Sequence, residues 1–316
     1  MKKTGFLYDV RYLLHDTGPY HPEAPERLTA IYKGIEAGAL LSQMIQIQGV
    51  RARRRWIEAV HDRAYIERFN DTCLTGRKMF DHPDNQMCGE SFETALLAVG
   101  GILKTVDMLM NGEIDNAFCA IRPPGHHAER DRALGFCYFN NVAIAARYLQ
   151  MQWNIERVGI VDVDVHHGNG TQHIFEKDPS VFYYSIHQHP SFAYPGTGRE
   201  FEYGSGEGYG YTKNNPVLPG QGDQEYTQLI EEHLLKDFER FKPEFVLVSV
   251  GFDGHVDDDM SDINLSTEWY SWIMKTILDM AETYSKGRLI SVLEGGYCLK
   301  RLPELARNHV EILLNG

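Results

Sequence analysis

The sequence predicts an α/β protein with helices on both faces of a mainly parallel central sheet. Short apolar runs typical of buried strands alternate with longer amphipathic stretches throughout the 316 residues. Such alternation produces βαβ units, in which the strands run parallel. No repeat, linker or low-complexity segment divides the chain. We therefore expect a three-layer αβα architecture formed by a single domain, residues 1–316.

The expected strands are short apolar runs with the length and composition of buried strands. In chain order they cover residues 5–9, 117–122, 157–166, 181–187, 245–252 and 289–293. The glycine-rich segment 203–211 is expected to be a loop, because glycine weakens both helices and strands.

The expected helices carry apolar residues at helical spacing. They cover residues 91–110, 141–153, 225–241, 267–284 and 301–314. The basic run 51–55 precedes Trp56, Ile57, Val60 and Tyr65, which also have helical spacing. We interpret this run as the solvated start of a helix rather than as a targeting or binding patch.

The composition argues against several classes of protein. A formal net charge of −13 disfavours general nucleic-acid binding, because phosphate contacts require basic surface, and it suits a cationic substrate. No apolar stretch approaches the ~20 residues that span a bilayer, and the first residues are too polar for a signal peptide. The five cysteines are odd in number and form no CxxC pair, so neither a disulfide framework nor a thiolate zinc cage is indicated. The expectation is a cytoplasmic protein that binds neither nucleic acid nor membrane.

Three ionisable residues stand at the end of the expected strand 157–166. Because side chains alternate along a strand, Asp162, Asp164 and His166 should share one face, with valines on the other. Burying two carboxylates and an imidazole costs on the order of several kcal/mol unless a cation or hydrogen bonds compensate. The pattern therefore predicts a metal site.

Polar residues also follow three other expected strands. His126 and His127 follow strand 117–122, Asp253 follows strand 245–252, and Tyr297 follows strand 289–293. The carboxyl ends of parallel strands meet at one edge of a sheet, where ligand crevices form. We therefore expect these residues to converge on one pocket.

The combination of Asp164, His166 and Asp253 predicts a catalytic metal. Three protein ligands leave a coordination position for water and substrate, as in catalytic zinc sites. Fe(II), Co(II) and Mn(II) also accept oxygen-rich ligation. A bound dication would assist amide hydrolysis by activating water and polarising the carbonyl.

Further groups could supply acid–base chemistry beside this metal. His126 and His127 are candidate acid–base residues, which Asp162 and Asn169 could orient. The Tyr297 hydroxyl is a candidate donor to a developing oxyanion. The remaining histidines are interpreted as surface or satisfied core residues.

With these motifs, the sequence resembles the zinc-dependent histone deacetylase and acetylpolyamine amidohydrolase superfamily, which has the arginase–deacetylase fold. The resemblance covers nearly the whole chain, from residues 21–28 to residues 294–297. The matching motifs occur in the family's order at residues 122–127, 135–140, 162–170, 194–198 and 251–253. Asn169 stands where class I members usually carry aspartate, which makes the chain class II-like.

The resemblance implies two kinds of metal. Zinc would be bound by Asp164, His166 and Asp253, with Fe²⁺ or Co²⁺ as possible replacements. A structural potassium ion would use the side chains of Asp162 and Ser185, together with main-chain carbonyls.

The resemblance also implies catalytic roles. His127 would be the general base and then the acid for the leaving amine, tuned by Asn169. His126, paired with Asp162, would be its electrostatic partner. Tyr297 would stabilise the oxyanion of the tetrahedral intermediate.

A substrate tunnel is implied as well. Gly135, Phe136 and Tyr194 match the walls that hold the methylenes of a lysine, and Met260 matches an apolar position of many lysine deacylases. Residues 257–259 are three aspartates where the family usually has a Gly-Asp-Pro segment, so a more acidic rim is expected there. These aspartates could attract a polyamine.

The leading hypothesis is a metal-dependent amide hydrolase acting on acyl-lysine in a peptide or protein. An acetylated polyamine or another small amide is the alternative substrate. A two-manganese ureohydrolase on the same fold is disfavoured, because only one metal-binding strand motif is evident. A catalytically silent binding protein is disfavoured because no ligand or catalytic residue is missing. The acyl-chain length and the oligomeric state stay open.

Overall fold

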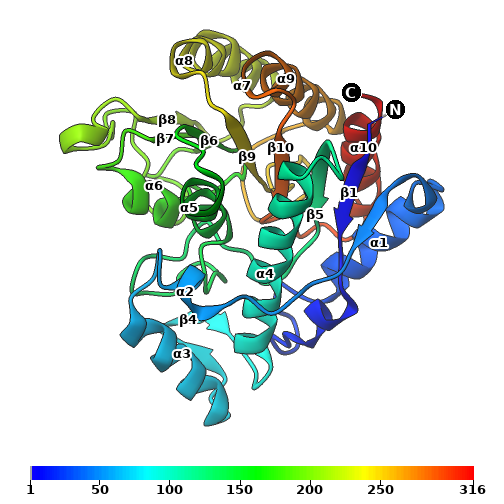
Figure 1. Cartoon of the computed structure of the whole chain (residues 1–316), viewed down its shortest axis with the longest axis vertical. Helices are drawn as coiled ribbons and strands as arrows, with labels where there is room; N and C mark the ends of the chain where they lie inside the picture. Colours follow the sequence, from blue (N-terminus) through cyan, green and yellow to red (C-terminus); the bar gives the residue numbers. More distant parts are fainter. Residues whose placement is uncertain (1) are drawn as a thin grey trace.

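A parallel eight-stranded sheet forms the centre of the computed structural model, which describes residues 2–316 (Figure 1). Its strand order is β2-β1-β5-β10-β9-β6-β7-β8, so the last strand of the chain lies between β5 and β9. The strands are β1 (Thr4–Leu7), β2 (Ile45–Ile47), β5 (Asn116–Cys119), β6 (Val158–Asp162), β7 (Val181–Gln188), β8 (Thr212–Val217), β9 (Phe245–Val250) and β10 (Leu289–Leu293). The expected parallel α/β sheet is confirmed.

Strand β6 is shorter than the predicted strand 157–166. It ends at Asp162, because the backbone N–H groups of Asp164 and His166 donate to the carboxylates of Asp162 (3.2 Å) and Asp164 (2.9 Å) instead of to a neighbouring strand. The prediction that Asp164 and His166 alternate along a regular strand is therefore wrong. Instead, the backbone directly after β6 is held by the carboxylate side chains of its own residues.

Four short strands were not predicted. Strands β2 and β8 lie at the two edges of the sheet, and β3 (Met79–Phe80) and β4 (His82–Gln86) form a separate antiparallel pair. β2 has only three residues, and β8 contains Lys213, two asparagines and Pro216. Edge strands tolerate proline and polar residues, so they lack the apolar signal of central strands.

Four predicted helices, 91–110, 141–153, 267–284 and 301–314, agree with the structure to within one residue at each end, whereas the helices Glu26–Ala37 and Asn169–Phe175 were not predicted. The helices are α1 (Glu26–Ala37), α2 (Arg54–Ile57), α3 (Arg63–Leu74), α4 (Ser91–Met110), α5 (Asn141–Trp153), α6 (Asn169–Phe175), α7 (Asp223–Leu229), α8 (Leu235–Phe241), α9 (Thr267–Ser285) and α10 (Leu302–Asn315). The predicted helix 225–241 is divided by the π-helical segment η4 (Ile230–Leu234), which joins α7 to α8. The basic run 51–55 leads into the single turn α2, and a separate helix, α3, begins at Arg63.

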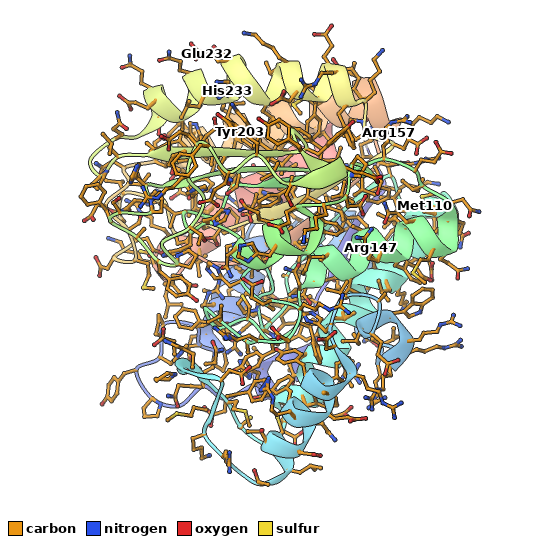
Figure 2. The ribbon with its side chains drawn as sticks, turned by 90° about the vertical axis from the view of Figure 1, so that its left-hand side faces the viewer. Met110, Arg147, Arg157, Tyr203, Glu232 and His233 are labelled. Carbon is orange, nitrogen blue, oxygen red and sulfur yellow. The ribbon has the colours of Figure 1, made fainter. Side chains whose placement is uncertain are left out.

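Helices cover both faces of the sheet (Figure 1). Helices α4 and α5 pack together on one side, whereas α9 and α10 pack together on the other and α1 packs onto α10. In the second view, η4 with Glu232 and His233 lies above α5 with Arg147 (Figure 2). The central strands β9 and β10 are buried along their whole length. Among the described residues, no helix is both long enough and apolar enough to cross a membrane.

Candidate metal centre and active site

Asp164, His166 and Asp253, hereafter the metal trio, meet at the carboxyl edge of the sheet. The first two follow β6 and the third follows β9, and each offers a ligand atom within 4.8 Å of the others. Backbone donors fix both carboxylates: the N–H of Gly295 donates to Asp164 Oδ2 (2.8 Å), and that of Val165 donates to Asp253 Oδ1 (3.1 Å). All three side chains are buried.

The metal trio carries more negative charge than its own imidazole can balance. His166 Nδ1 lies 3.2 Å from Asp164 Oδ1 and 3.1 Å from Asp253 Oδ2. Burial disfavours the charged imidazole, but these two carboxylates outweigh it and raise the pKa of His166 to about 10. Burial, followed by the charge of Asp164, raises the pKa of Asp253 to about 6. Two buried carboxylates and one imidazole aimed at a common point fit a divalent cation.

His126 is a charged histidine beside the metal trio. It follows β5, and its Nδ1 lies 3.1 Å from Asp162 Oδ2, which also accepts a hydrogen bond from the Tyr183 hydroxyl (3.0 Å). Burial alone would lower the pKa of His126, but Asp162, Asp164 and Glu294 raise it to about 10. The structure thus joins His126 to Asp162, as the sequence predicted.

His127 has the opposite electrostatic character. Burial, together with the nearby charges of His126 and His166, holds the pKa of His127 well below its usual value. Its Nδ1 lies 2.7 Å from Oδ1 of Asn169, the first residue of α6. A neutral imidazole that donates its Nδ1 proton to Asn169 keeps its Nε2 lone pair as a base.

Tyr297 lies on a turn that its neighbours hold firmly. Gly296 has a φ of 111°, which favours glycine, and the backbone N–H groups of Tyr297 and Cys298 donate to Asp258 Oδ2 (2.6 and 2.8 Å). The Arg27 guanidinium lies 4.8 Å from the centre of the Tyr297 ring. Burial raises the pKa of the phenol well above its usual value, so the hydroxyl keeps its proton and can donate it in a hydrogen bond.

A narrow cavity of about 140 Å³ reaches His126, His127 and His166 from the surface. Gly135, Phe136, Tyr194, Met260 and Tyr297 line it, so the predicted tunnel residues are together. A Cβ at Gly135 would lie 2.2 Å from Cδ2 of His127, and the Tyr194 ring packs edge-on against His127 at 4.9 Å between centroids. The walls are largely apolar and suit an alkyl chain.

Several residues of the site were not predicted. The exposed carboxylate of Asp84, on the short strand β4, also lines the cavity. The buried carboxylate of Glu294 accepts hydrogen bonds from the backbone N–H groups of Gly125 (2.6 Å) and His126 (3.1 Å). In the sequence, the only indication of Glu294 was its position as a charged residue directly after the expected buried strand 289–293.

A second group behind the pocket also escaped prediction. The Arg27 side chain donates to the main-chain oxygens of Glu294 (2.5 Å) and Gly296 (2.6 Å). Glu23 accepts hydrogen bonds from Arg27 (3.1 Å) and Arg122 (2.8 Å), and all three are fully buried. The Arg27 hydrogen bonds fasten the turn before Tyr297 to helix α1, and the ion pairs with Glu23 hold the Arg27 side chain in place.

Of the acidic rim expected at residues 257–259, Asp257 and Asp259 are exposed and Asp258 is not. Asp258 is buried and anchors the Tyr297 turn, and Asp257 pairs with Arg301 (2.5 Å). Only Asp259 has neither constraint among the described residues. The Asp258 carboxylate accepts hydrogen bonds from the backbone N–H groups of the Tyr297 turn. This structural role explains the aspartate at this position without a cationic ligand.

Ser185 lies opposite Asp162 in the register of β6 and β7, as a shared cation site would require. Its hydroxyl lies 2.7 Å from Nδ1 of His187, whose Nε2 in turn contacts the carbonyl oxygen of Gly198 (2.8 Å). His187 is thus a hydrogen-bonded core residue, as expected.

Comparison with known proteins assigns residues 21–313 to the histone deacetylase domain. A probable deacetylase of Archaeoglobus fulgidus is 40% identical over 94% of this chain and 82% of its own length. A histone deacetylase-like amidohydrolase of Pseudomonas aeruginosa is 32% identical over 96% of this chain and 83% of its own length. The crystal structure of the HDA15 HD domain matches 99% of this chain and 88% of its own, with a TM-score of 0.92 and 33% identity.

Proposed function

The chain belongs to the histone deacetylase family, and from this we propose that it is a metal-dependent amide hydrolase that removes acetyl, or another short acyl group, from acyl-lysine side chains. Residues 1–316 would act as one catalytic domain. The observation that carries the proposal is that His127, Tyr297 and His166 line one narrow cavity, and that His166 also belongs to the metal trio.

The proposed metal is zinc, held by the metal trio, with Fe²⁺ or Co²⁺ as possible replacements. When bound, such a dication lowers the pKa of a water molecule and polarises the amide carbonyl. A potassium ion between Asp162 and Ser185 is proposed as a structural ion. Its charge would lie next to the carboxylate that pairs with His126.

The chain's own residues would divide the remaining chemistry. His127 accepts the proton of the attacking water at Nε2 and later gives it to the leaving amine. His126, charged and paired with Asp162, stays protonated throughout and stabilises negative charge. The Tyr297 hydroxyl donates to the oxyanion as the carbonyl carbon becomes tetrahedral.

The cavity favours a substrate with an extended alkyl chain. Phe136, Tyr194 and Met260 present apolar surface, which suits the methylenes of acyl-lysine. One observation favours an acetylated polyamine as the alternative: the Asp84 carboxylate lines the same cavity and could pair with a second ammonium group.

A substrate panel tests the proposal. We expect the purified, metal-loaded protein to hydrolyse acetyl-lysine peptide with a higher kcat/KM than acetylated putrescine or spermidine, and longer acyl-lysine peptides should define the chain length. His127→Ala should remove the activity. Tight binding of acyl-lysine peptide without any hydrolysis would instead indicate a silent binding protein. A higher kcat/KM for the acetylated polyamines would make them, rather than acyl-lysine, the preferred substrate.

A further inference from the structure

A chain of hydrogen bonds leads from His127 to the surface of the protein. Asn169 Oδ1 lies 2.7 Å from His127 Nδ1, and Asn169 Nδ2 donates to Glu129 Oε1 (2.5 Å). The same Glu129 oxygen lies 2.8 Å from Nδ1 of His173. Asn169 and His173 are four residues apart on α6, so both side chains face the loop that carries Glu129.

The amide of Asn169 cannot fix the tautomer of His127 by itself. An amide presents an acceptor on one side and a donor on the other, and its two orientations have nearly the same shape. With Oδ1 toward His127, the imidazole carries its proton on Nδ1 and is a base at Nε2. With Nδ2 toward His127, the proton moves to Nε2 and that base is lost.

Glu129 removes this ambiguity. A carboxylate accepts hydrogen bonds but cannot donate them, so it requires the Nδ2 side of Asn169 to face it. The carbonyl oxygen of His127 also accepts from Nδ2, at 3.3 Å, but this contact is longer and uncharged. The short bond to Glu129 is charge-assisted, and such bonds are about twice as strong as neutral ones.

We propose that Glu129 is a positioning residue: it fixes the amide of Asn169 and thereby the base-competent tautomer of His127. The inference rests on the proposed function, in which His127 is the general base. Glu129 is only 17% exposed, and His173 holds it from the solvent side. His173, interpreted from the sequence as a surface or core histidine, thus has a specific contact.

The surroundings of this contact are charged. The side chains facing His173 include Glu129, Glu176 and Glu202, and Arg130 and Arg147 line the same surface hollow. Arg147 is visible on this side of the molecule (Figure 2). The hydrogen bond to Glu129, opposed by burial, raises the pKa of His173, which favours the protonated imidazole next to the carboxylate.

A pair of substitutions separates this role from general destabilisation. Glu129→Gln replaces the carboxylate with a group that both donates and accepts, so Asn169 loses its fixed orientation. We expect kcat to fall about tenfold or more, with KM changed less than twofold, because the substrate does not touch Glu129. The acidic limb of the kcat profile should move to lower pH, since the negative charge that Asn169 connects to His127 has been removed.

Adding Asn169→Asp to Glu129→Gln should restore the rate. An aspartate accepts the Nδ1 proton of His127 without help, and the amide introduced at position 129 can then donate to that aspartate. Asn169→Asp alone places two carboxylates in contact and should reduce kcat. Each substitution is therefore harmful alone, whereas the pair recovers most of the activity, a pattern that simple loss of stability does not produce.

Nitrogen NMR of the zinc-loaded protein with ¹⁵N-labelled histidine reads the tautomer directly. We expect a proton on Nδ1 of His127 in the unaltered protein and a population with the proton on Nε2 in the Glu129→Gln variant. Glu231→Gln, on the exposed surface of η4, is the matched control and should change neither tautomer nor rate.

Either an unchanged His127 tautomer in Glu129→Gln or a double variant no faster than Glu129→Gln would overturn the inference. The His127→Ala variant keeps the proposed function separate. If His127→Ala is inactive while Glu129→Gln is fully active, the positioning role is wrong and the amide hydrolase stands. If His127→Ala is fully active, the proposed mechanism itself fails.

Discussion

Each of two buried clusters brings three potential metal ligands within 4.8 Å of one another. One is the metal trio, and the other consists of His126, Cys137 and Glu294. They are neighbours, since His126 Nε2 lies 3.8 Å from Asp164 Oδ1. The two clusters have the same burial and similar residue types, so composition alone does not distinguish them.

In the second cluster, each of the three side chains already has hydrogen-bond partners within the protein. Glu294 accepts from two backbone N–H groups and from the hydroxyl of Ser249 (3.2 Å). His126 Nδ1 is directed to Asp162. Burial raises the pKa of Cys137 well above its usual value, and the thiol donates to the carbonyl oxygen of Gly135 (3.2 Å). A protonated thiol is a poor metal ligand.

The metal trio differs in one decisive respect. Asp253 Oδ2 is held by the ring N–H of His166, and that proton can be exchanged for a cation. A Cβ at Gly295 would lie 2.1 Å from Asp253 Oδ2, so the glycine leaves the carboxylate uncovered. In the metal trio, one carboxylate oxygen, Asp253 Oδ2, is thus paired with a proton that a cation can replace.

Removing a ligand of the metal trio should have the largest effect. We expect Asp253→Ala to lose stoichiometric metal and to hydrolyse acyl-lysine peptide at the background rate, because one of three ligands is gone. Elemental analysis and single-turnover rates measure both. A variant that kept one metal ion per chain and full activity would show that Asp253 does not belong to the centre.

Tyr297→Phe should have the next largest effect. Loss of one oxyanion donor typically lowers kcat by about 10²–10³-fold, or about 2.7–4 kcal/mol. Metal content and thermal stability should stay unchanged, because the backbone of residue 297, rather than its hydroxyl, is anchored by Asp258. An unaltered kcat would remove Tyr297 from the mechanism.

A histidine with no acidic neighbour extends the comparison. His309 is buried between Phe118 and Phe252, and burial lowers its pKa from 6.5 to about 3. Between about pH 3 and pH 6.5, His309 therefore binds a proton in the unfolded chain but not in the folded protein. The free energy of unfolding consequently decreases as the pH falls below about 6.5.

Replacing His309 with leucine should remove that loss. The unaltered protein should lose about 2 kcal/mol more than His309→Leu between pH 7 and pH 5. Denaturant unfolding at both pH values measures the difference. Equal pH dependence in the two proteins would mean that His309 is not held neutral.

The smallest effect is expected at Cys137. Cys137→Ala removes a potential ligand of the second cluster, yet the protein should keep one equivalent of zinc, with a stability loss of about 1 kcal/mol for the small cavity. Loss of zinc in this variant, measured beside Asp253→Ala, would reverse the assignment of the two clusters.

Most of the fold could be predicted because its central strands and long helices are buried along extended apolar patterns. Strand β10 and helices α4 and α5 have the predicted bounds. The edge strands and the hairpin β3–β4 could not be found, since β2 and β3 have only three and two residues and β4 and β8 are rich in polar residues and proline. An extended apolar run, rather than strand formation itself, produces the readable pattern.

The candidate site could be predicted where ionisable residues stand at the ends of apolar strands, as Asp164 and Asp253 do. His126, His127, His166 and Tyr297 line one cavity with the four expected tunnel residues, and Asp164 and Asp253 lie beside His166. Glu129 and Arg27 are connected to the site by hydrogen bonds to residues far away in the sequence, Asn169 for Glu129 and Glu294 for Arg27. The sequence alone does not reveal such contacts. Asp84 was missed with the hairpin that carries it.

Strand β10 is synthesised last among the strands, yet it lies in the middle of the sheet. In the finished sheet, β10 alone joins two groups of strands, β2-β1-β5 and β9-β6-β7-β8, which share no sheet hydrogen bonds with each other. The metal trio's loops belong to the second group, whereas His126 and His127 follow a strand of the first. Completion of β10 joins the two groups, and Arg27 then secures the turn that carries Tyr297. A nascent chain should therefore remain inactive until its final strand has been inserted.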